Sequence, residues 1–187
     1  MSIDLTFGFE KTGFVGYTSY ERDGGYDDAD FEVLGKGGIG TNTKIEIRKL
    51  IYGMNAVSLG LGITFFQYRA NSISGWMGEI LDSKNVLIPS LCLQLGHIFN
   101  VKSDGNFNVS LKNNLALMKN TKFSEYYLKE INLIWRPGIY LEKTISMRNS
   151  LIFEINYGLG LLRLSENDRY ELRNNALGLN LGIRRQL

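Results

Sequence analysis

Charged side chains recur at every second position along several segments of this chain. In the segment 44–48, Lys44, Glu46 and Arg48 are separated by isoleucines. Residues two apart on an extended chain point to the same side, so these charges share one face. The candidate site residues selected on this pattern are Lys44, Glu46, Arg48, Lys112, Arg136, Glu154 and Arg184. Their mixed sign suits two kinds of chemistry: a structural network of ion pairs, or a narrow path for ions.

The other reactive residue types do not form a catalytic or metal-binding pattern. His97 is the only histidine, and its local sequence GHIFNV contains no serine that it could activate. We therefore expect an interfacial histidine rather than a catalytic base. Cys92 is the only cysteine, and the acidic stretch DGGYDDADFE lacks the ligand spacing of a calcium loop. The sequence predicts no enzyme activity, no cofactor and no metal site.

The elements that carry these residues are long strands with two different faces. In the last segment, leucine or isoleucine at 177, 179, 181 and 183 alternates with Gly178, Asn180, Gly182 and Arg184. Similar alternation predicts eight strands, at about 3–20, 38–53, 56–70, 86–101, 107–120, 128–143, 150–164 and from 174 to the end. Pro137 predicts a bulge or bend in the sixth. A sheet of such strands avoids open edges by closing, so the last strand should pair with residues near Ile3 to Phe9.

The connections between these strands alternate in length. The longer ones lie at about 21–37, 71–85, 121–127 and 165–173, and the shorter ones near 53–55, 102–106 and 144–149. Long loops at one end and short turns at the other are typical of an outer-membrane barrel.

The glycines indicate which face of the strands points inward. Most strand glycines, such as Gly60, Gly62 and Gly178, lie on the polar face, where they would make room inside a narrow barrel. The apolar face would then contact lipid, and aromatic residues near strand ends, among them Phe66 and Tyr140, would form interface girdles. The opposite orientation, a soluble lipid-binding barrel of the lipocalin type, remains an alternative.

Composition excludes several other classes of protein. The 187 residues predict a single domain over 1–187, and no apolar run reaches the roughly 18 residues of a membrane helix. Lys and Arg are scattered among Asp and Glu, which argues against a nucleic-acid partner. The first residues do not form a signal peptide. We expect that such a signal has been removed and that the mature chain lies in the outer membrane; a cytoplasmic location is the other interpretation.

The strand number, the alternation, the loop asymmetry and the last strand resemble those of the small eight-stranded outer-membrane barrels, such as the OmpA transmembrane domain, OmpX and OmpW. Leu179, Leu181, Ile183 and Leu187 keep the spacing of the family's last strand, although the family typically ends in an aromatic residue. The resemblance implies an all-β fold, an eight-stranded antiparallel up-and-down transmembrane β-barrel.

An eight-stranded barrel is barely wide enough for its own side chains, so the charged set is interpreted first as a structural network. The predicted function is that of a non-enzymatic outer-membrane barrel that anchors surface loops. Loops 21–37 and 71–85, the second with an apolar tip at Trp76 and Met77, would bind a protein partner. Lipopolysaccharide is the expected lipid partner. A small passive pore for ions or hydrophobic solutes is the alternative function.

Overall fold

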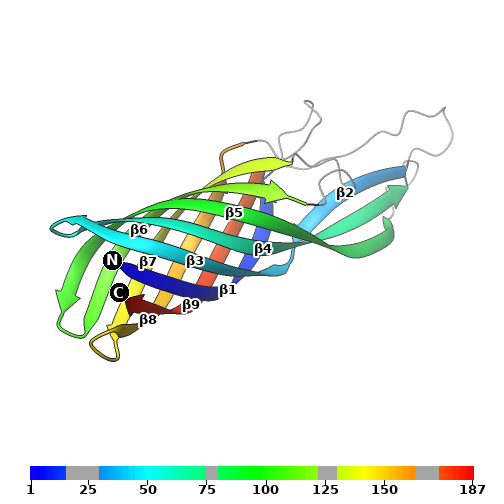
Figure 1. Ribbon diagram of the computed structural model, residues 1–187. Helices are drawn as coiled ribbons and strands as arrows, with labels where there is room; N and C mark the ends of the chain where they lie inside the picture. The colour runs from blue at the N-terminus through cyan, green and yellow to red at the C-terminus, as the bar shows by residue number, and fades with distance from the viewer. Residues whose placement is uncertain (16–29, 75–79, 122–129, 163–172) are drawn as a thin grey trace.

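The computed structural model describes residues 1–15, 30–74, 80–121, 130–162 and 173–187 (Figure 1). All regular secondary structure in these ranges is β-strand. The strands are β1 (Ser2–Val15), β2 (Asp30–Gly37), β3 (Ile39–Tyr52), β4 (Asn55–Ser74), β5 (Ile80–Asp104), β6 (Phe107–Asn120), β7 (Ile131–Thr144), β8 (Asn149–Gly160) and β9 (Arg173–Gln186). Within the described ranges, no helix has the length and hydropathy needed to cross a membrane.

Eight of the strands form a closed antiparallel barrel. Neighbours follow the order β1, β3, β4, β5, β6, β7, β8, β9, and β9 returns to β1. The closing ladder runs from Ser2 opposite Gln186 to Val15 opposite Arg173. The predicted barrel is confirmed, as is the pairing of the last strand with the residues around Ile3 to Phe9. Closure removes the unpaired sheet edges that a chain of long amphipathic strands would otherwise expose.

At the long-loop end, strands replace much of two predicted loops. β4 and β5 have 20 and 25 residues and remain paired beyond the barrel. β2 pairs with β4 along this extension, from Asp30 opposite Ser74 to Gly37 opposite Tyr68. We call residues 30–37, 68–74 and 80–86 the ribbon; it projects past the rim (Figure 1). The prediction of loops over 30–37, 71–74 and 80–85 was therefore wrong. Pairing satisfies backbone groups that a loop would leave to water.

Pro137 does not cause the predicted bulge. The register of β7 against β8 is the same on both sides of it, with Trp135 opposite Leu159 and Gly138 opposite Asn156. The ladder lacks pairs at positions 136 and 137, because proline has no N–H to donate. The strand therefore passes the proline with a local gap in hydrogen bonding and no shift in register.

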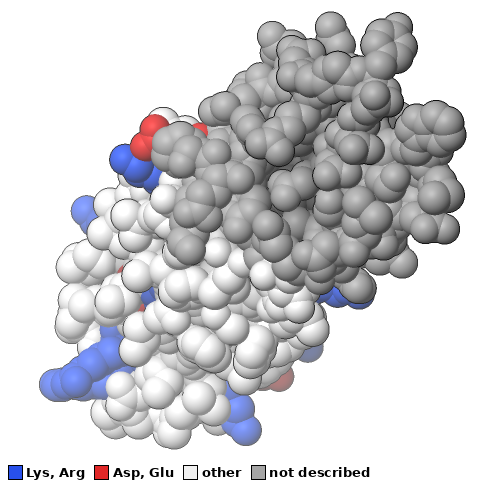
Figure 2. All heavy atoms as spheres, turned by 90° about the vertical axis from the view of Figure 1, so that its right-hand side faces the viewer, with Lys and Arg blue, Asp and Glu red and all other residues white. Residues whose placement is uncertain are grey.

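The two faces of the wall differ in chemistry. Odd-numbered side chains point outward and form an apolar belt around the barrel, and Figure 2 shows broad uncharged surface over the described residues. The belt includes Leu5, Phe7, Ile45, Ile47, Leu59, Leu61, Leu93, Leu95, Leu115, Leu117, Trp135, Ile139, Leu151, Ile155, Leu179 and Leu181. Even-numbered side chains point inward and are largely polar.

This arrangement is the reverse of a soluble barrel, which keeps apolar side chains inside. The soluble lipid-binding alternative is therefore wrong. An apolar outer belt with a polar interior is the pattern of a barrel embedded in an outer membrane, where the lipid bilayer covers the belt.

Candidate functional site: the charged interior of the barrel

Among the residues whose side chains the structure describes, ten charged ones are buried inside the barrel, five acidic and five basic. They are Asp4, Glu10, Glu46, Glu142, Glu154, Lys44, Arg48, Lys112, Arg136 and Arg184. They divide into three groups along the barrel, and each group contains equal numbers of acids and bases. Neutrality within each group follows from the cost of burying an unpaired charge.

The first group lies at about half height and consists of Lys44, Glu46, Lys112 and Glu154, which we call the middle cluster. The Lys112 Nζ lies 2.6 Å from Glu46 Oε2 and 3.1 Å from Glu154 Oε2. The Lys44 Nζ lies 3.0 Å from Glu154 Oε2 and 3.8 Å from Glu46 Oε2. The four charges therefore form a closed ring in which both lysines contact both carboxylates.

Neutral side chains complete the hydrogen bonding of this ring. Donors to the two carboxylates are Ser58, Gln94 and Asn156. Gly60 makes room for the ring, because a Cβ atom there would lie 2.6 Å from the Glu46 Cγ. The middle cluster therefore fills the interior, and each of its four carboxylate oxygens accepts at least one hydrogen bond.

The second group is a bidentate pair nearer the long loops. Arg136 Nη1 donates to Glu10 Oε1 at 2.6 Å, and Arg136 Nη2 donates to Glu10 Oε2 at 3.1 Å. Asn42 also donates to Glu10. A bidentate guanidinium–carboxylate pair is among the strongest charge-assisted contacts in proteins. Here it joins β1 to β7 across the interior.

The third group, the short-turn cluster, consists of Asp4, Arg48, Glu142 and Arg184. Arg184 donates to both oxygens of Asp4 at 2.7 Å, and its Nη1 donates to Glu142. Arg48 is held more loosely, with its Nη1 4.0 Å from Glu142 Oε2. Its Nη2 donates to Asn100 at 3.3 Å.

Tyr140 separates the middle cluster from the short-turn cluster. Its ring is buried, and its hydroxyl donates to Asp4 Oδ2 at 3.0 Å. Three cations surround the ring at 5.3 to 5.7 Å from its centroid: Arg48, Lys112 and Arg184. Cations at this distance are attracted by the ring quadrupole, so Tyr140 links the two clusters energetically.

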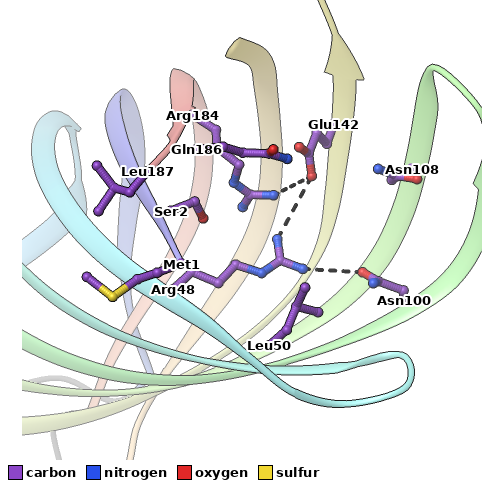
Figure 3. A pocket seen from close by; sticks show the side chains of 10 residues that line it. All are labelled: Met1, Ser2, Arg48, Leu50, Asn100, Asn108, Glu142, Arg184, Gln186 and Leu187. Carbon is purple, nitrogen blue, oxygen red and sulfur yellow. Dashed lines mark hydrogen bonds and ion pairs between the residues drawn. The ribbon is translucent and has the colours of Figure 1, made fainter. Parts of the chain in front are cut away.

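Below the short-turn cluster, a cavity of about 290 Å³ opens at the short-turn end (Figure 3). We call it the vestibule. The polar side chains in its wall are Ser2, Arg48, Asn100, Asn108, Glu142, Arg184 and Gln186.

The structure buries all seven sequence-predicted site residues inside the barrel but divides them among the three groups. Only Lys44, Glu46, Lys112 and Glu154 contact one another as ion pairs. Arg136 pairs instead with Glu10, and Arg184 pairs with Asp4 and Glu142. The interior is thus three compact groups rather than one continuous network.

Sequence reasoning left Asp4, Glu10, Glu142 and Tyr140 out of the site. The charge balance could have found the three acids, because the predicted set has five bases but only two acids. All three acids lie at even positions, on the same face as the bases they neutralise. Tyr140 was expected in an interface girdle, as was Phe66; both predictions were wrong, because these even-numbered side chains are buried in the interior.

Of the residues considered for catalysis, His97 lies outside the barrel and Cys92 lies inside it. His97 is exposed on the outer face, where its Nε2 lies 3.1 Å from Asn55 Oδ1. Cys92 is buried. Among the described residues, no group of three or more His, Cys, Asp or Glu side chains is arranged to hold a metal ion. Trp76, Met77 and most of the acidic stretch 23–32 lie outside the described residues.

The fold is similar to that of solved outer-membrane proteins. The outer membrane protein OprG from Pseudomonas aeruginosa matches with a TM-score of 0.57 and 8% identity over 98% of this chain and 94% of OprG. The attachment invasion locus protein Ail of Yersinia pestis matches with a TM-score of 0.43 and 10% identity, over 98% of this chain and 97% of Ail. The outer membrane protease OmpT from Escherichia coli matches with a TM-score of 0.39 and 9% identity, over 100% and 97% of the two chains.

No protein-family model matches the sequence, and no curated protein does either. The likeness to OprG, at low identity, shows the fold. Together with the apolar outer belt, it confirms the resemblance to the small outer-membrane barrels and places this chain in an outer membrane.

Proposed function

We propose that this protein is a non-enzymatic outer-membrane anchor, which holds a protein-binding surface at the long-loop end. The observation that carries the proposal is the filled interior. Three charge-neutral groups lie at successive levels, and in the middle cluster and the Arg136–Glu10 pair every carboxylate oxygen accepts a hydrogen bond from another interior side chain. A barrel built in this way is a rigid support rather than a site for chemistry.

The middle cluster argues against a passive pore, which is the alternative. Glu46, Lys112 and Glu154 are each 1% exposed in their side chains, and Lys44 is 9% exposed. An ion passing this level would have to separate pairs buried at 2.6 to 3.1 Å, and breaking a buried pair costs about 3–5 kcal/mol. The vestibule lies on the short-turn side of this obstruction.

The ribbon supports the choice of the long-loop end as the binding surface. A tilted strand needs about 9–11 residues to cross a bilayer, whereas β5 has 25. The extra length of β4 and β5, with β2 beside them, extends ordered backbone past the rim (Figure 1). We propose that this ribbon and the connections it carries, within 21–37 and 71–85, contact a partner protein. Lipopolysaccharide is the proposed lipid around this end.

A photoreactive residue in place of Glu32, in β2, tests this proposal on intact cells. We expect covalent adducts of defined mass from position 32. A matched photoreactive residue in place of Ser146, in the short turn between β7 and β8, should give none of these adducts. Identical adducts from both positions, or none from position 32, would remove the support for a binding surface on the ribbon.

A further inference from the structure

The vestibule contains a buried arginine that uses little of its hydrogen-bonding capacity. Arg48 is 6% exposed, and its guanidinium lies across the vestibule between Glu142 and Asn100 (Figure 3). Of its five N–H donors, one makes a hydrogen bond, to Asn100. Its Nη1 makes none.

Arg184, in the same cluster, makes more hydrogen bonds than Arg48 does. It donates from Nε, Nη1 and Nη2 to Asp4, Glu142 and Tyr140. Since Glu142 is already bound by Arg184, it serves Arg48 only through the 4.0 Å ion pair. Rotation of the Arg48 guanidinium toward the vestibule would weaken one hydrogen bond to Asn100, this long ion pair and the contact with the Tyr140 ring.

Exposed basic side chains outnumber exposed acidic ones at the short-turn end of the barrel, where the vestibule opens. The exposed cations of this end are Lys49, Lys102, Lys143, Arg148 and Arg185, and the exposed acid in the same turns and strand ends is Asp104. None of the five cations forms an ion pair with another described residue. An excess of unpaired cations at one end of the barrel raises the local concentration of anions there.

We propose that the vestibule binds a small oxyanion, a phosphate group, on Arg48. A guanidinium matches the geometry of a phosphate through two parallel N–H donors. The amide groups of Asn108 and Gln186, in the opposite wall, supply further donors. A volume of about 290 Å³ is enough for a hydrated phosphate. The cavity opens to the aqueous short-turn end, which faces the periplasm in barrels of this type.

Titration of inorganic phosphate into the full chain in a maltoside detergent, followed by calorimetry, tests the site. We expect binding by the wild type, an at least tenfold weaker affinity in Arg48→Gln, and a less than twofold change in Lys102→Gln. Gln186→Glu, which adds a charge to the wall and leaves Arg48 and its contacts in place, should also weaken binding at least tenfold. This second variant tests the site even if Arg48→Gln fails to fold.

A second experiment, in nanodiscs, distinguishes soluble phosphate from a lipid headgroup as the source of the bound phosphate group. If the bound group is soluble phosphate, its affinity should be the same in discs of neutral lipid and in detergent. If it belongs to a lipid headgroup, discs with phosphatidylglycerol should compete with phosphate, and Gln186→Glu should abolish the competition. Equal losses of phosphate affinity in Arg48→Gln and Lys102→Gln would show that phosphate is attracted by the general positive charge of this end, and would overturn the site. An absence of phosphate binding in both detergent and nanodiscs would also overturn it.

Discussion

The middle cluster and the short-turn cluster contain the same charges, two acids and two bases, but hold them differently. In the middle cluster both lysines contact both carboxylates, and the shortest contact is 2.6 Å. In the short-turn cluster Arg184 donates hydrogen bonds to both acids. Arg48 lies beside a cavity, with its Nη1 4.0 Å from Glu142 Oε2. Equal composition therefore yields a closed structural unit in one place and an available cation in the other.

The largest loss of stability should come from removing one charge of the middle cluster. Lys112→Met leaves Glu46 and Glu154 buried with only Lys44 between them, and removing one partner of a buried network costs about 3–5 kcal/mol. The free energy of unfolding can be measured with urea in lipid vesicles by tryptophan fluorescence. The control is Lys119→Met, in an exposed pair with Glu130, which should cost less than about 1 kcal/mol. Similar losses in both variants would contradict the assigned role.

A neutral replacement in the same cluster sharpens this test. Lys112→Met combined with Glu46→Gln removes one charge of each sign and leaves the Lys44–Glu154 pair. The double variant should be more stable than Lys112→Met by about 1–3 kcal/mol, because no carboxylate remains unpaired. The same vesicle assay measures this difference. If the double variant instead lost as much stability as the two single variants added together, charge balance would not govern this interior.

The short-turn cluster should tolerate the loss of its loose cation. Arg48→Gln removes one hydrogen bond, a long ion pair and one contact with the Tyr140 ring, so we expect a loss of about 1–2 kcal/mol. Arg184→Gln, in the same cluster, removes the arginine that pairs with both Asp4 and Glu142. It should lower the free energy of unfolding by about 3–5 kcal/mol. Unfolding of the two variants side by side measures this difference. Equal losses would contradict the distinction between the two arginines.

The smallest effect is expected from the tyrosine between the clusters. Tyr140→Phe removes the hydroxyl that donates to Asp4 but keeps the ring among its three cations. Because Asp4 keeps both hydrogen bonds from Arg184, the loss should be about 0.5–1 kcal/mol. Tyr140→Leu, which also removes the ring, should lose more in the same assay. Equal losses in the two variants would show that the cation–ring contacts contribute nothing.

The sequence was enough to predict the barrel wall, because alternation is a local property of each strand. Position parity put Lys44 and Leu181 on opposite faces without any knowledge of the neighbouring strands. The grouping of the charges was not predictable in this way. Arg184 binds Asp4, 180 residues away, and Arg136 binds Glu10, 126 residues away. Such partners depend on the stagger of the strands around the closed barrel, which alternation does not encode.

The ribbon was missed for a related reason. Its segments 71–74 and 80–85 are rich in polar residues and were interpreted as a loop, whereas backbone pairing between β4 and β5 makes them strands. Burial could not guide the prediction there, because the ribbon lies beyond the bilayer-spanning wall. For the missing acids of the site, the excess of bases in the predicted set and the even positions of Asp4, Glu10 and Glu142 were available clues.

Single-channel recording in planar bilayers tests most directly whether the filled interior makes this barrel an anchor. The account predicts that the wild-type protein inserts without producing conductance steps, because the middle cluster closes the interior. Discrete steps in the wild type that disappear on replacing Glu154 or Arg136 would contradict it and identify the charged interior as an ion path.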